Sequence, residues 1–290
     1  MDYHSERFQD FSLMVYHNNK IVALLPANKV DNVLYSHQGL TYGGLIGRKD
    51  LKSTDFLECF KAILKFLNDN GVRRLSIKEL PGMYLCNPTN NPLAYVAFKT
   101  QAELLRTDLH SVIDMEHISY SNSRKEGIKR GVKANLKVEE SDSFDLFWNA
   151  ILLPNLASKH GVKPAHSLEE ITLLKSRFKH NIRQFNVFDG DVIVGGTTIF
   201  ETEQLAHCQY ISGNAAKNEL GSLDFLHHHL IDTVFKNKRY FDFGTSNINS
   251  GAQINKGLLF WKEGFGARSV PQRFFEIKTE NYKLLDTIMV

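Results

Sequence analysis

Apolar and polar side chains alternate with a period of two in several short runs of the chain, and this pattern predicts β-strands. Residues 13–16 and 21–25 form two such runs, and the polar residues between them supply the turn of a hairpin. Asp189-Gly190 is the strongest hairpin signal and joins expected strands at 182–188 and 192–200. Further strands are expected at residues 33–35, 74–80, 94–98, 104–115, 205–212, 240–243 and 274–278.

A period of about 3.6 residues predicts the helices. Residues 54–70 place Phe60, Leu64 and Leu67 on one face, and Gly71 ends the pattern. Ser167 begins another helix, because a glutamate three residues later completes a capping box. Other helices are expected at residues 119–137, 144–156 and 223–235.

Each half of the chain therefore contains strands, a helix and more strands, which predicts an α/β protein with mixed sheets. The character of the sequence changes at a polar, basic segment that begins near residue 119. We place the domain boundary just before it, which gives domains at 1–117 and 118–290. The two halves show no convincing direct repeat, so the pattern alone does not indicate a duplicated fold.

The composition is that of an ordinary globular protein, with 290 residues, 42% hydrophobic and 23% charged. No apolar run approaches the length of a membrane span, and no signal peptide precedes the first strands, so we expect a cytoplasmic protein. The three cysteines, Cys59, Cys86 and Cys208, are odd in number and widely separated, which argues against a disulfide framework and a zinc site. The net charge of +3 is too small to indicate nucleic-acid binding by itself.

Residues 240–267 are the segment most typical of a functional site. An alternating run that includes Asp242 predicts the end of a strand, and Gly244 is expected to break it. A polar loop follows, and then Leu258 and Trp261 at helical spacing predict a short helix that carries Lys262. An acid at a strand end, a small polar loop and a helix with a lysine suggest a site on an α/β scaffold.

This segment also resembles a known family. Phe241-Asp242-Phe243-Gly244, followed by residues 261–266 (WKEGFG), is similar to the C-terminal signature of the FemAB-like acyltransferases in the GNAT superfamily, although Trp261 stands where phenylalanine is commoner. Segments 42–45, 124–131 and 186–199 resemble further parts of that family, in the same order. The resemblance implies two GNAT-like domains in tandem. It also implies an N-acyltransferase that moves an acyl or aminoacyl group to an amine.

Three residues are candidate catalytic residues. Asp242 could hold the substrate amine or act as a base, although an acid at a strand end more often caps the next loop. Lys262 matches the lysine whose implied role in the family is donor binding or oxyanion stabilisation, and the competing interpretation is a solvated helix residue. Tyr210, on an expected central strand, could donate a proton or line the cleft, with packing as its ordinary role.

The resemblance to the GNAT superfamily implies a donor site where two central strands separate and main-chain N–H groups at a helix N-terminus bind the phosphates. The corresponding turn, residues 214–223, retains only Gly221-Ser222 and lacks a glycine-rich pyrophosphate loop. Lys129 and Lys133 belong to a cationic helix stripe that could anchor donor phosphates, with a solvated helix face as the alternative. The balance favours acyl-CoA (acetyl-CoA) as co-substrate, and aminoacyl-tRNA is the competing donor.

The expected acceptor is a small-molecule amine, an amino sugar or a cell-wall precursor. No metal is expected, because the consecutive residues His227, His228 and His229 point in different directions on a helix and cannot converge on one ion. The degenerate phosphate turn leaves an alternative of another class, a catalytically silent GNAT-fold ligand-binding module.

Overall fold

The structure is a computed structural model that describes residues 6–41, 43–85, 87, 91–160 and 163–288. Cys86 and Tyr42, which entered the sequence predictions, lie outside these residues. The chain divides into two units: Met1–Asp108, Asn247–Gln253 and Pro271–Val290 form the first, and Leu109–Ser246 with Ile254–Val270 forms the second. This division does not coincide with a boundary at 117/118. The difference arises because the chain returns to the first unit, where its last strand pairs with an early one.

The first unit contains a small antiparallel sheet and part of a larger mixed sheet. The small sheet has the order β1 (Leu13–His17), β2 (Lys20–Leu25), β5 (Ile46–Gly47). The larger one has the order β3 (Asn28–Val30), β4 (Val33–Tyr35), β6 (Arg74–Lys78), β15 (Arg268–Lys278), β7 (Glu103–Asp114). The predicted β1–β2 hairpin is confirmed, and Asn18 and Asn19 in its turn both have positive φ, as a tight hairpin turn requires.

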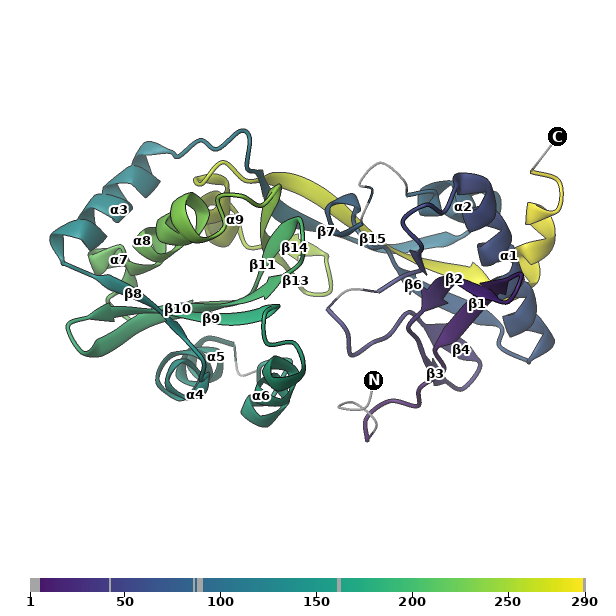
Figure 1. The fold of residues 1–290 in the computed structure, drawn as a ribbon, viewed down its shortest axis with the longest axis horizontal. Helices are drawn as coiled ribbons and strands as arrows, with labels where there is room; N and C mark the ends of the chain where they lie inside the picture. Colours follow the sequence, from purple (N-terminus) through teal and green to yellow (C-terminus); the bar gives the residue numbers. More distant parts are fainter. Residues whose placement is uncertain (1–5, 42, 86, 88–90, 161–162, 289–290) are drawn as a thin grey trace. The chain divides into compact units, whose positions relative to one another are not determined.

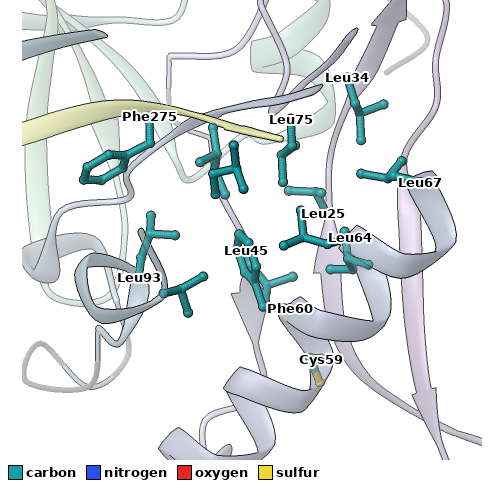
Figure 2. Close-up of a cluster of buried hydrophobic side chains, with 14 of the residues drawn as sticks. Leu25, Leu34, Leu45, Cys59, Phe60, Leu64, Leu67, Leu75, Leu93 and Phe275 are labelled. Atoms are coloured by element: carbon teal, nitrogen blue, oxygen red, sulfur yellow. The ribbon is translucent and has the colours of Figure 1, made fainter. Parts of the chain in front are cut away.

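Helix α1 (Ser53–Asp69) buries the apolar face that the sequence predicts. Figure 2 shows Phe60, Leu64 and Leu67 of α1 beside Leu25, Leu34 and Leu75 of the strands, and all six side chains are at most 1% exposed. Two short 3₁₀ segments, Gly82–Tyr84 and Thr279–Leu285, complete the unit together with α2 (Leu93–Lys99).

The strand predicted at residues 94–98 is wrong, because this segment forms α2. Leu93, Val96 and Ala97 are buried at helical spacing, whereas Tyr95 and Phe98 are exposed. The alternating aromatic and aliphatic residues imitate a strand, but Pro92 immediately precedes the helix, a position where its missing N–H costs no helical hydrogen bond.

The second unit is built on a sheet with the order β7, β12 (Tyr240–Thr245), β11 (Leu205–Gly213), β10 (Val192–Glu201), β9 (Ile182–Asp189), β8 (Lys137–Ser141). The turn at Asp189-Gly190 joins the antiparallel strands β9 and β10, as predicted. The register of this pair shifts between Ile193 and Gly195, so β10 contains a β-bulge immediately before Gly195.

Helices cover both faces of this sheet (Figure 1). On one face lie α3 (Asn122–Lys133), α7 (Lys217–Leu220), α8 (Ser222–His229) and α9 (Lys256–Glu263). On the other lie α4 (Asp145–Phe147), α5 (Leu153–His160) and α6 (Leu168–Arg177). One-turn π-helical segments, Trp148–Leu152 and Leu230–Val234, interrupt two of the predicted helices. The Ser167–Glu170 capping box is present at the start of α6.

Candidate active site

Strands β11 and β12 run parallel and then separate. Their pairing covers Leu205 with Tyr240, Ala206 with Phe241, and His207 with Asp242, although β11 continues to Gly213 and β12 to Thr245. This is the separation of two central strands that the sequence resemblance implies for the donor site. The last paired residues, His207 and Asp242, therefore mark the point where the opening begins.

Beyond this point β12 does not end at Gly244, as the sequence predicted, but continues through it as a bulge. Gly244 has a φ of +70°, which glycine adopts without strain. The pairing of β12 with β7 shifts register between Asp242 and Thr245. Oδ1 of Asp242 accepts a hydrogen bond of 2.7 Å from the Gly244 N–H. The acid of the signature thus caps the bulge that follows it.

Lys262 binds the same bulge from α9. Its Nζ donates to the carbonyls of Gly244 and Thr245 at 3.0 and 2.7 Å. The residue is 2% exposed, so the interpretation as a solvated helix residue is wrong. Burial lowers the pKa of Lys262 to about 8, although the negative charge of Asp242 acts in the opposite direction. The two signature residues therefore stabilise one main-chain feature from both sides.

Asp242 is fully buried and contacts two histidines. Nδ1 of His207 and Nδ1 of His110 lie 2.8 and 2.9 Å from its Oδ2. Burial alone would raise the pKa of Asp242, but the two histidines lower it well below its usual range. A carboxylate held in this way is an acceptor of hydrogen bonds and not a free base. His110 was missed by the sequence analysis, because it is 132 residues from Asp242 and no local motif links them.

Tyr210 makes a separate set of contacts. Its hydroxyl lies 3.0 Å from the main-chain N of His166 and 2.7 Å from the Nδ1 of the same residue. Its ring packs edge-on against Trp148, with 5.1 Å between the ring centroids. The contacts of Tyr210 therefore support the packing role, and its position in a catalytic step stays a prediction.

A cavity of about 630 Å³ opens at the end of β11, next to the first turns of α8 and α9. Three cationic side chains line it, from Arg124, Arg130 and Lys217. Asn155, Asn218 and Asn255 contribute amide groups to the same wall. Its apolar wall consists of Leu152, Leu156, Ile211, Leu223, Leu258 and Trp261. A cavity of this kind suits a ligand that combines an anionic part with an apolar part.

One of these cations is already paired. Arg124 forms an ion pair with Asp224, and the indole Nε1 of Trp261 donates to the same carboxylate at 2.7 Å. Burial raises the pKa of Asp224, although Arg124 and Trp261 act against this shift. Trp261, the signature position where the family more often has phenylalanine, therefore uses its indole N–H to orient a wall of the cavity. This role is specific to the tryptophan of this chain.

Lys129 and Lys133, the cations that the sequence analysis offered as donor contacts, lie on an exposed face of α3. Lys129 pairs with Glu126 and has a side chain 72% exposed, and Lys133 is also exposed; neither is among the described residues that line the cavity. Their spacing indicates one helix face, but only the packed structure shows which face meets the cavity. Arg124 and Arg130, on the same helix, are the cations that line it.

Gly221 and Ser222 have packing roles. Gly221 has a φ of +65°, and a Cβ at this position would lie 2.0 Å from the carbonyl oxygen of Gly127 in α3. The absence of a side chain therefore allows α3 and α8 to pack closely. Ser222 is fully buried at the start of α8. The binding of donor phosphates by this turn stays a prediction.

No family model matches this chain, and no curated protein matches it either. Solved structures do match. FemX has a TM-score of 0.70 at 8% identity, over 98% of this chain and 92% of FemX. The C-terminal domain of a protein from Agrobacterium fabrum, assigned as a lysylphosphatidylglycerol synthetase, has 0.60 at 12% identity, over 93% and 83%. A tandem GNAT protein from the clavulanic acid biosynthesis pathway has 0.53 at 12% identity, over 92% and 82%.

The chain therefore shares its fold with FemX and with a tandem GNAT protein, and the expected α/β class with a mixed sheet is confirmed. At these identities the likeness concerns the fold and not the substrates. Within the described part of the chain, no helix has both the length and the apolar character that crossing a membrane requires.

Proposed function

We propose that this protein is an N-acyltransferase that moves an acyl or aminoacyl group from an activated donor to an amine. The observation that carries the proposal is the cavity at the end of β11, where β11 has separated from β12 and where cationic and apolar walls meet. An activated acyl donor has these two parts, a phosphate-bearing nucleotide and an acyl group. The FemAB-like fold and the signature residues around Gly244 support the same activity.

The reaction itself needs positioning more than covalent catalysis. The nitrogen of a neutral amine attacks the acyl carbon, a C–N bond forms, and the C–S bond of a thioester or the C–O bond of an ester breaks. The amine proton leaves the nitrogen and the thiolate or alkoxide takes up a proton. We assign Asp242 and Lys262 to the shape of the β12 bulge beside the opening, since both bind Gly244. Lys262 acts here as a positioning residue.

For the donor we propose an acyl-CoA, with Arg130 and Lys217 as partners of its phosphates. A donor that is bound by a few cations inside a cavity does not require the wide basic surface that a tRNA would contact. The acceptor would be a small amine, an amino sugar or a cell-wall precursor in the cytoplasm. The exposed stripe of Lys129 and Lys133 keeps aminoacyl-tRNA as the competing donor.

Ligand-induced stabilisation tests the proposal directly. Acetyl-CoA, a longer acyl-CoA and bulk aminoacyl-tRNA are titrated against the protein, and the unfolding temperature is recorded. A donor present at a hundred times its dissociation constant adds about 2.7 kcal/mol to the free energy of unfolding. Transfer to a panel of amines is then followed with the stabilising donor by release of the free thiol or the free tRNA.

Two variants on the same helix locate the donor. For an acyl-CoA, Arg130→Ala should raise the ligand concentration needed for the same rise in unfolding temperature by at least about tenfold. Lys129→Ala should leave this concentration unchanged. A response to aminoacyl-tRNA alone, weakened by both variants and by salt, would replace acyl-CoA as the donor. Stabilisation by a donor without transfer to any amine would support the silent binding module, and a response to none of the three would reject the proposed donors.

A further inference from the structure

Three buried ionisable side chains meet in the sheet of the second unit. His110 belongs to β7, His207 to β11 and Asp242 to β12, and β12 pairs with both of the other strands. The two histidines are 6% and 5% exposed, and the aspartate is fully buried. Burial of three such groups together is costly unless they bind one another or a common ion.

The atoms that converge are the ones that bind metal ions in proteins. Nδ1 of His110, Nδ1 of His207 and a carboxylate oxygen of Asp242 all lie within 4.8 Å of one another. Both nitrogens approach the same oxygen, Oδ2, at 2.9 and 2.8 Å. The other oxygen, Oδ1, accepts the N–H of Gly244, which fixes the rotation of the carboxylate. Such a bond, one step removed from the ligand atom, is typical of metal-binding carboxylates.

We propose that His110, His207 and Asp242 form a binding site for one divalent transition-metal ion, with Zn²⁺ as the expected occupant. Two imidazole nitrogens and one carboxylate oxygen are a ligand set of zinc proteins, with bonds of about 2.0–2.2 Å. Neighbouring ligand atoms around such an ion lie about 3 Å apart, close to the separations of 2.8 and 2.9 Å seen here. The two ring nitrogens lie within 4.8 Å of each other, so coordination would draw both toward an ion bound beside Oδ2.

The alternative is a triad held by hydrogen bonds alone. In that case both imidazoles carry a proton on Nδ1 and donate it to Oδ2, and no ion is needed. A metal ion would use the lone pairs of all three groups at the place where they converge, and would supply positive charge beside a buried carboxylate. The buried ammonium of Lys262 donates to main-chain carbonyls of the neighbouring bulge, whereas the two imidazoles contact Oδ2 directly.

A bound ion would have a structural consequence. It would join β7, β11 and β12 by bonds between side chains at the residue where the pairing of β11 with β12 stops. The proposal concerns the site itself and holds whether or not the chain transfers acyl groups.

Metal content measured on the full chain, purified without a polyhistidine tag and without chelator, tests the proposal. We expect about one Zn²⁺ per chain by inductively coupled plasma mass spectrometry. Chelation should lower the unfolding temperature, and added Zn²⁺ should restore it. Co²⁺ added to the chelated protein should give the visible absorption of a four- or five-coordinate site. His110→Gln and His207→Gln should each weaken Zn²⁺ binding by at least about 100-fold.

His117→Gln is the matched control. Asp114, Glu116 and His117 form a second group of ligand-type atoms, but two of them are exposed, and Arg239 already pairs with Asp114 and Glu116. This variant should keep the metal content of the wild type.

If a His110→Gln or His207→Gln variant fails to fold, the Co²⁺ spectrum of the wild type still decides between the metal site and the hydrogen-bonded triad. Absence of metal and of Co²⁺ uptake, with Nδ1–H signals from both histidines by ¹⁵N NMR, overturns the site in favour of the hydrogen-bonded triad. Metal that persists in the His110→Gln/His207→Gln double variant also overturns it.

Discussion

At the scale of single residues, the structure changes the role of the signature lysine more than that of any other residue. Lys262 was expected either to meet a donor or to lie in solvent, and the second alternative is wrong, because its buried ammonium is bonded to two carbonyls of the β12 bulge. Sequence spacing placed it correctly on a short helix. The spacing could not show that the bulge at Gly244 would turn two carbonyls toward it.

Lys262→Met should therefore reduce stability as well as any activity. The substitution preserves much of the side-chain volume but leaves the carbonyls of Gly244 and Thr245 without their donor, at a cost of about 1–3 kcal/mol. Equilibrium denaturation in urea measures the change. Lys129→Ala, on an exposed surface, should change the free energy of unfolding by less than about 0.5 kcal/mol. A Lys262→Met protein as stable as the wild type would show that the two bonds contribute nothing.

The same lysine predicts a pH dependence. Its pKa is lowered to about 8 in the folded protein, from an ordinary value of 10.5 that the unfolded chain retains. Between these two pH values the unfolded state binds more protons than the folded state, so the contribution of Lys262 to stability rises with pH. The free energy of unfolding of the wild type minus that of Lys262→Met should grow through this window by up to about 3 kcal/mol. A flat or falling difference would contradict the lowered pKa.

At the scale of elements, α3 and α8 pack closely because three glycines line their contact. A Cβ on Gly127 would lie 1.7 Å from a carboxylate oxygen of Asp224, and one on Gly131 would lie 2.5 Å from the Cβ of Phe225. The sequence resemblance included Gly127 and Gly131 but gave no reason for them. The close approach also carries Arg124 to Asp224, and so it forms one wall of the cavity.

Alanine substitutions at two glycines with similar positive φ angles distinguish the cost of backbone strain from the cost of a steric clash. Gly190 and Gly221 have φ of +57° and +65°, but only Gly221 has neighbours within contact distance of an added Cβ. Gly190→Ala should lower the free energy of unfolding by about 1–2 kcal/mol, which is the cost of placing an alanine in the left-handed backbone conformation. Gly221→Ala should cost clearly more, because the added methyl meets the Gly127 carbonyl. Thermal unfolding of both variants makes the comparison, and equal losses would refute the close packing of α3 on α8.

Local patterns predicted most elements correctly, because their causes are local. The Ser167–Glu170 capping box and the Asp189-Gly190 turn are defined within a few residues. The site was predicted only in part, because its contacts join distant residues: His110 reaches Asp242 across 132 positions. The strand prediction for the segment that forms α2 was wrong, because its apolar side chains fit both the strand period and the helix period. Packing against the rest of the unit decides between the two.

At the scale of the whole molecule, the chain crosses between its two units more often than the sequence suggested. Residues 271–290 belong to the first unit, where Phe274–Lys278 pairs with β6. Phe275, Ile277 and Leu285 from this segment are buried in the core around α1. No turn or composition signal marks this return, because a strand looks the same in sequence wherever it pairs.

The fragment 1–117 should consequently fail to fold alone, although it corresponds to the first domain expected from the sequence. It lacks β15, which is one of the two strands that pair with β6, and three buried side chains. Truncation of one large core side chain already costs about 2–5 kcal/mol against a total stability of about 5–15 kcal/mol. Fusing residues 271–290 to the fragment through a flexible linker should restore protection of the α1 amides from hydrogen exchange. The same fusion with Phe275→Asp and Ile277→Asp is the control, because it keeps the length but cannot fill the core. Native-like protection in the unfused fragment would mean that the returning strand is dispensable and that the first domain ends near residue 117.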